Sequence, residues 1–241
     1  MIGIFVQLLL SWIIVWLLEK RNLSVLGFTP SKQRLSGFGI FFFLTAACCA
    51  SGFLMKMFFS TNAWKPNPFL SSKLVLEGIW WNLRSVLFEE LIFRGVLLYI
   101  LINRIGVRRA VVVSAVAFGV YHWFSFGVIG NAVAMAYTFF ITGTMGLLLA
   151  YGYAKTLSLY IPVAIHLGWN FTQIFVFSQG PIGNGILVPV GNSEFRTDSL
   201  PVYILVTFLP LSLAIFLNYI LLKKVAFFEF RKPMLYTSPG D

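Results

Sequence analysis

Ionisable side chains occur inside stretches of this sequence that are otherwise strongly apolar. The first group is Glu89, Glu90 and Arg94, in the segment FEELIFRG. A charged side chain at the bilayer centre costs about 2.5–3.5 kcal/mol on insertion scales, so such residues usually pair and mark functional sites. Glu90 and Arg94 are four residues apart and can pair on one helix face, whereas Glu89 lies about 100° around the helix. An ion pair that locks two helices needs only one acid. The second acid therefore indicates a functional carboxylate, such as a general base.

Two further polar groups lie in apolar stretches: His122 in AFGVYHW, and His166 with Asn170 in IPVAIHLGWN. Each has a structural explanation when it is considered alone. A single histidine near a helix end can bond a backbone carbonyl, and a His–Asn pair can be an interhelical polar contact. However, these are the only two histidines of the chain. Their expected depths resemble that of Glu89, which permits one shared cavity.

The composition requires these residues to be positioned by membrane helices. Of 241 residues, 59% are hydrophobic and 11% are charged, whereas soluble domains carry about 25% charged residues. A helix needs roughly 20 apolar residues to cross a bilayer. The predicted fold class is all-α, a polytopic transmembrane bundle of seven or eight spans. The seven predicted spans are residues 2–18, 36–59, 74–102, 107–124, 131–154, 157–178 and 199–222. The third is long and contains Arg84, and residues 86–102 are expected to form its true crossing.

Basic residues predict the topology. Alternate loops and the tail hold twelve Lys and Arg residues, and the opposite loops hold only Lys65, Lys73 and Arg196. This bias predicts a multi-pass protein of the cell membrane with its N-terminus outside and its C-terminus cytoplasmic. It also accounts for the net charge of +10 through topology and lipid contacts, so no nucleic-acid partner is expected. The twelve residues are Lys20, Arg21, Lys32, Arg34, Arg104, Arg108, Arg109, Lys155, Lys223, Lys224, Arg231 and Lys232.

The expected organisation is a single membrane domain in three parts. Residues 1–75 hold the N-terminal spans, and residues 76–178 form the catalytic core. Residues 179–241 hold a loop, the last span and a cytoplasmic tail. The two cysteines, Cys48 and Cys49, are adjacent within an apolar run, which excludes a disulfide framework and favours a packing role.

The three polar motifs resemble those of the CPBP family of membrane proteases, which joins CAAX prenyl endopeptidases (type II) to bacterial Abi and bacteriocin-immunity proteins. The family pattern is EExxxR, then FxxxH, then HxxxN or HxxxD. Here the pattern is matched in order, over residues of about 85–175, by Glu89-Glu90 with Arg94, Phe118 with His122, and His166 with Asn170. Any one motif is weak, but three in order on membrane helices are a specific signal.

The resemblance and the residue types support the same hypothesis, an intramembrane endopeptidase that needs no metal. Glu89 would act as general base on a water molecule that His122 helps to orient. His166 and Asn170 would donate hydrogen bonds to the tetrahedral oxyanion. Glu90 and Arg94 would hold Glu89 in place. The resemblance implies a membrane-associated peptide or protein substrate, such as a C-terminally lipidated or a bacteriocin-like peptide.

Two alternatives remain open at this point. Glu89, His122 and His166 could bind zinc as a His2Glu set, although the sequence has no HExxH motif and Arg94 would disfavour a divalent cation. Alternatively, buried ionisable groups build proton relays in transporters, and an immunity protein could use the same helices only for binding. A proton path has no need for a neutral Asn170, which favours the endopeptidase.

Overall fold

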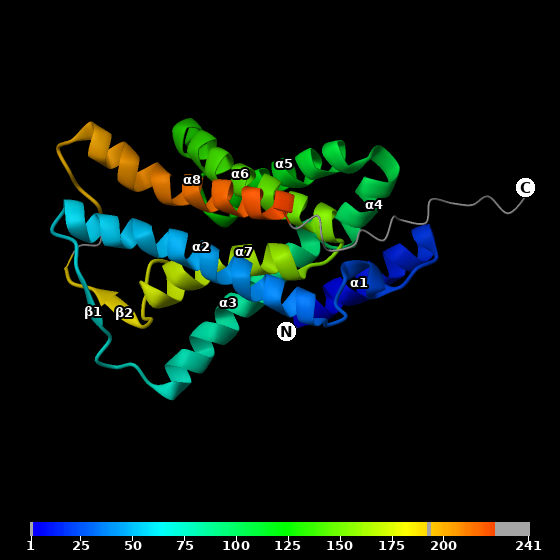
Figure 1. Cartoon of the computed structure of the whole chain (residues 1–241), viewed down its shortest axis with the longest axis horizontal. Coiled ribbons are helices and arrows are strands. Elements are labelled where there is room, and N and C mark those ends of the chain that lie inside the picture. Colours follow the sequence, from blue (N-terminus) through cyan, green and yellow to red (C-terminus); the bar gives the residue numbers. More distant parts are fainter. Residues whose placement is uncertain (1, 192–193, 225–241) are drawn as a thin grey trace, which may run out of the picture.

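The computed structural model describes residues 2–191 and 194–224 of the chain (Figure 1). The predicted cytoplasmic tail beyond residue 224, with Arg231 and Lys232, lies outside the described residues. The described part is all-α apart from one short pair of strands, and it forms eight α-helices. In chain order the elements are α1 (Ile2–Glu19), η1 (Leu23–Leu26), α2 (Lys32–Phe59), β1 (Trp64–Pro66), α3 (Ser72–Phe93), α4 (Val96–Ile105), α5 (Val107–Ser125), α6 (Ala132–Thr156), α7 (Tyr160–Asn170), the π-helical η2 (Phe171–Val176), β2 (Leu187–Pro189) and α8 (Leu200–Lys224).

The chain is a polytopic helical membrane protein. Helices α1, α2, α6 and α8 are long and apolar enough, by length and composition, to cross a bilayer. They correspond to four of the seven predicted ranges. The other three ranges also contain helices, but two of these depart from the prediction because the backbone changes course within them.

The predicted third span is not one helix. Helix α3 runs without interruption from residue 72 to residue 93, and the chain then breaks at Arg94 and Gly95 before α4 begins. The prediction that residues 86–102 form a single crossing is therefore wrong. Hydropathy could not locate the break, because the residues on both sides of it are apolar. The predicted range 157–178 likewise becomes the short helix α7 followed by π-helical turns.

The loops gather at two ends of the bundle. At one end the turn between α6 and α7 contacts the segment around η1: the Leu159 N–H donates to the Leu26 carbonyl, and the Ser158 hydroxyl donates to the Gly27 carbonyl. At the other end β1 and β2 pair antiparallel, with Lys65 opposite Val188. This pairing joins the α2–α3 loop to the segment before α8, at the left of Figure 1.

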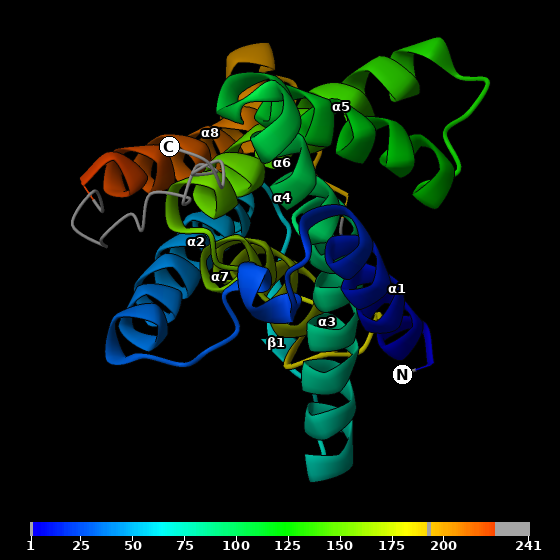
Figure 2. The same ribbon diagram turned by 90° about the vertical axis from the view of Figure 1, so that its right-hand side faces the viewer.

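Helix α7 lies inside the bundle and contacts α2, α3 and α6 (Figures 1 and 2). Its approach to α2 depends on Gly168, where a Cβ atom would lie 2.5 Å from the Phe42 carbonyl oxygen. Helix α2 in turn is tied to α8 by a buried hydrogen bond from the Asn218 amide to the Thr45 hydroxyl, 3.0 Å long. Small residues and polar contacts of this kind are what hold membrane helices together.

We predict that Gly168→Ala destabilises the bundle, because the added methyl group meets backbone that cannot rotate away. The expected loss is about 1–3 kcal/mol, measured as a lower Tm of the purified protein in detergent. The matched control is Gly39→Ala on α2, where an added Cβ meets no atom within 4 Å. This control should be neutral or slightly stabilising, because Ala favours helix more than Gly does. Equal Tm values for the two variants would contradict the close approach of α2 and α7.

Candidate active site

The three segments that carry the motifs meet at Glu89. This residue lies near the end of α3, His122 near the end of α5, and His166 on α7. The Oε2 atom of Glu89 lies 3.8 Å from Nε2 of His122 and 3.8 Å from Nε2 of His166. The Glu89 side chain is only 14% exposed, and each histidine side chain is 8% exposed. The fold thus brings one carboxylate and two imidazoles, 77 residues apart in sequence at most, to a single buried point.

The contacts of Glu90 differ from those of Glu89, and they join buried residues of the core. Its Oε1 atom accepts from Nη1 of Arg94 at 3.1 Å and lies 2.7 Å from Nδ1 of His166. Glu90 and Arg94 are completely buried. The predicted pairing of these two residues is therefore present, and it extends to a third residue on another helix.

Arg94 connects three helices. Its guanidinium carbon lies 4.0 Å from the centre of the Phe118 ring on α5, which is a cation–π contact. Its Nη2 atom donates to the Gly146 carbonyl on α6 at 3.5 Å. A Cβ atom at Gly146 would lie 3.2 Å from both the Ala115 backbone and the Phe118 ring. A larger residue at this position would therefore press on the ring that Arg94 contacts.

The orientation of each histidine is fixed through its Nδ1 atom. In His122, Nδ1 lies 2.7 Å from the Phe118 carbonyl, and in His166 it lies 2.7 Å from the Glu90 carboxylate. Both partners are acceptors, so each Nδ1 carries the proton, and in the neutral ring Nε2 is then an acceptor. Asn170 completes the arrangement, with its Nδ2 atom 3.1 Å from Nε2 of His166.

The break between α3 and α4 also positions the site. A Cβ atom at Gly95 would collide with the Leu91 carbonyl oxygen, so only glycine permits this turn. The Phe93 carbonyl accepts a hydrogen bond from the Ser114 hydroxyl of α5 at 2.8 Å. A backbone group at the end of α3 is thereby satisfied by the helix that carries His122.

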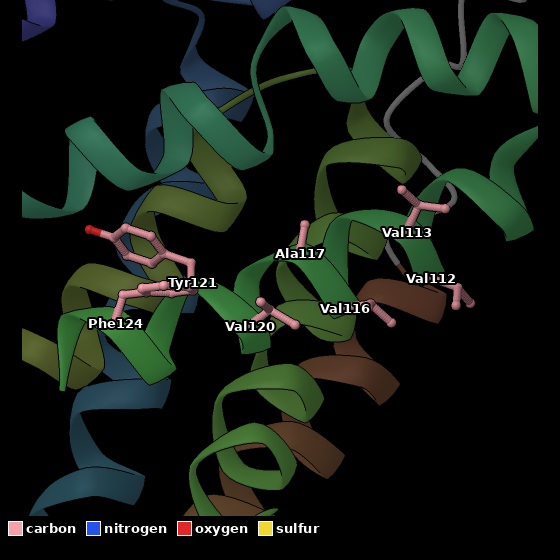
Figure 3. A pocket seen from close by; sticks show the side chains of 7 residues that line it. All are labelled: Val112, Val113, Val116, Ala117, Val120, Tyr121 and Phe124. Carbon is pink, nitrogen blue, oxygen red and sulfur yellow. The ribbon is translucent and has the colours of Figure 1, made fainter. Parts of the chain in front are cut away.

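Glu89 opens into a recess of about 320 Å³ between α1, α3 and α5. Tyr121 also lines a second, apolar groove of about 590 Å³ along α5 (Figure 3). The Glu89 side chain therefore borders a recess at the surface of the helix core, next to an apolar groove. The recess is lined by Gly3, Ile4, Trp81, Arg84, Ser85, Phe88, Glu89 and Tyr121, and the groove by Val112, Val113, Val116, Ala117, Val120, Tyr121 and Phe124.

Sequence reasoning missed two residues of this region. Arg84 was assigned no role, although an ionisable residue within a predicted span is the same signal that pointed to Glu89. Tyr121 carried only a weak signal, its place next to His122, because one tyrosine among many aromatic residues is not unusual. The physical role of Phe118 also required coordinates, since the motif does not reveal that its ring contacts Arg94.

The geometry bears on the alternative zinc site. The proposed ligands Glu89, His122 and His166 do converge. However, among residues 2–191 and 194–224 no group of three or more His, Cys, Asp or Glu side chains is arranged to hold a metal ion. Nε2 of His166 is also in contact with Asn170, so a zinc ion could use that nitrogen only by displacing the amide.

Comparison with known protein families bears on the central part of the chain, where residues 71–172 match one family. This part is a type II CAAX prenyl endopeptidase Rce1-like domain. The resemblance predicted from the three motifs is thus confirmed. The Rce1-like domain includes α3 to α7 and with them all six predicted site residues. No curated protein and no solved structure matches the chain.

We predict that Glu90→Ala destabilises the protein severely, because it leaves Arg94 buried without its partner carboxylate. Breaking a buried pair in this way costs about 3–5 kcal/mol, to be measured by thermal or denaturant unfolding in detergent. Glu77→Ala on the same helix is the matched control, because Glu77 is 62% exposed and pairs with Lys73 only at the surface. That loss should be below about 1 kcal/mol. Similar losses of stability in the two variants would show that the buried pair contributes no more to stability than the exposed one.

Proposed function

We propose that this protein is an intramembrane endopeptidase that hydrolyses a peptide bond of a membrane-associated substrate by means of a glutamate-activated water molecule. The observation that carries the proposal is the position of Glu89 Oε2, 3.8 Å from each of two histidine Nε2 atoms. That separation is too long for a direct hydrogen bond, and the buried Oε2 atom has no hydrogen-bond partner among the described residues, so in this proposal a water molecule bridges the carboxylate and the imidazoles. The Rce1-like family of residues 71–172 supports the same class of activity.

In the proposed mechanism the water donates one hydrogen to Glu89 and the other to Nε2 of His122. The second bond is available because Nδ1 of His122 already donates to the Phe118 carbonyl. Glu89 removes a proton as the water oxygen attacks the scissile carbonyl carbon. When the carbon–nitrogen bond breaks, the same proton passes from Glu89 to the leaving amine. The products are a carboxyl and an amine, and Glu89 returns to its starting state.

The oxyanion of the tetrahedral intermediate would be stabilised by His166 and Asn170. Nε2 of His166 can donate to the oxyanion only in the doubly protonated ring, whose other N–H group, at Nδ1, is held by the Glu90 carboxylate at 2.7 Å. Asn170 Nδ2 has two hydrogens, and the residue lies at the end of α7 beside Nε2 of His166. One donor of this type is worth about 2.7–4 kcal/mol of barrier.

The substrate must approach from the membrane in this proposal. The recess that contains Glu89 shares Tyr121 with the apolar groove on α5, so an apolar segment can lie next to the reactive carboxylate. A lipidated peptide and a bacteriocin-like peptide both meet this requirement. We further propose an outside N-terminus and a cytoplasmic end for α8, since the loops that gather with η1 hold most of the basic residues.

We predict that Glu89→Gln abolishes proteolysis, because the amide cannot accept the proton from water. The rate should fall by about 10²–10⁴-fold, measured with the purified protein in liposomes containing a library of membrane peptides, with product ends mapped by mass spectrometry. Glu77→Gln is the control, as it removes an exposed carboxylate from the same helix and should retain the wild-type rate. Full turnover by Glu89→Gln, in protein of unchanged Tm, would remove Glu89 as the base. Proton or solute flux without cleavage in the same vesicles would instead support the transporter alternative.

We also predict that exhaustive chelation leaves the cleavage rate unchanged, because Asn170 contacts the Nε2 atom of His166, which a zinc ion bound to Glu89, His122 and His166 would need. The measurement is the same liposome assay after treatment with a strong zinc chelator and dialysis. Loss of activity that added zinc restores would assign the chemistry to the His2Glu alternative.

A further inference from the structure

Arg84 lies on α3, five residues before Glu89, and lines the same recess. Apolar and aromatic walls near it are provided by Ile4 of α1, Phe88 of α3 and Tyr121 of α5. The residue is exposed to the recess rather than buried in the core. A guanidinium therefore shares a semi-enclosed space with the carboxylate that the proposed function makes the base.

Arg84 has no hydrogen bond and no ion pair with any residue that the structure describes. The glutamates in the described ranges are engaged elsewhere, so none of them neutralises this charge. Glu19 pairs with Arg104, Glu77 with Lys73, Glu90 with Arg94 and Glu194 with Arg196, while Glu89 faces the two histidines. Arg84 thus differs from Arg94, whose positive charge the protein itself compensates.

The distance between the two groups along α3 indicates what could bind there. Five helical residues advance about 7.5 Å along the axis, and an extended peptide advances about 3.3–3.6 Å per residue. With the scissile carbonyl at Glu89, the span from Glu89 to Arg84 corresponds to roughly two extended residues, and the long Arg84 side chain widens this range. A planar guanidinium binds a carboxylate through two parallel hydrogen bonds.

We propose that Arg84 is a specificity-determining residue that binds a carboxylate of the substrate, about two to four residues from the scissile bond. The proposal rests on the proposed function, because it uses Glu89 as the point of cleavage. The carboxylate is either the free C-terminus of the peptide or an acidic side chain. In both cases Arg84 selects the substrate and sets its register, while Glu89 and the histidines act on the bond.

The test compares substrates with and without the carboxylate. Wild-type protein and Arg84→Gln are reconstituted in phosphatidylcholine liposomes with a randomised membrane-peptide library, made once with free C-termini and once with amidated C-termini. Mass spectrometry gives kcat/KM for each product. Wild type should prefer peptides that carry the carboxylate by about 10–100-fold, mainly through KM, and Arg84→Gln should bring this ratio close to one. Preference that survives amidation but requires Asp or Glu near the cleavage site assigns the side-chain form of the ligand.

Two matched variants complete the design. Arg109→Gln removes one exposed positive charge at the start of α5, outside the recess, and should keep the wild-type ratio. Arg84→Lys keeps the charge without the two-pronged geometry and should give an intermediate ratio. An unchanged ratio in Arg84→Gln overturns the inference. If wild type cleaves free and amidated peptides equally, with no preference for Asp or Glu near the cleavage site, and Glu89→Gln abolishes this cleavage, the role of Arg84 is overturned while the protease is retained. No cleavage by any variant overturns both.

Discussion

A buried ion pair is the constraint on which the arrangement of the core helices depends. Glu90 and Arg94 are fully enclosed, and an enclosed charge is tolerated only when partners satisfy it. Those partners come from other helices: His166 on α7, the Phe118 ring on α5 and the Gly146 carbonyl on α6. The need to satisfy one guanidinium and one carboxylate therefore fixes four helices relative to one another.

The same constraint separates two adjacent carboxylates that have identical chemistry. Glu90 is turned towards Arg94 and His166, and it keeps the Nδ1 side of that imidazole occupied. Glu89, one residue earlier, faces the two Nε2 atoms and the recess. Only Glu89 combines a buried position with access from outside. The structural pair thus orients His166, and the neighbouring carboxylate is left for reaction.

Much of the site could be predicted from the sequence, because ionisable residues in apolar helices have few alternatives to pairing or function. The spacing of Glu90 and Arg94 indicated their pairing directly, and the helical class followed from composition. The third and sixth predicted ranges failed in detail for a different reason. The turn at Gly95 brings the chain against the Leu91 carbonyl of its own helix, and the helix after Asn170 continues as π-helical turns. Hydropathy records neither feature. The cation–π platform on Phe118 and the free charge of Arg84 are also properties of neighbours that are distant in the sequence.

The turn at Gly95 affects how α5 is rotated about its own axis relative to the candidate active site. In an unbroken helix the Phe93 carbonyl would accept a hydrogen bond from a backbone N–H of the next turn of the same helix. Here it accepts a hydrogen bond from the Ser114 hydroxyl of α5 instead. His122 lies eight residues further along α5, about two helical turns away, so this bond contributes to fixing the direction in which the imidazole points. The break at the end of α3 thus affects the orientation of a side chain on α5.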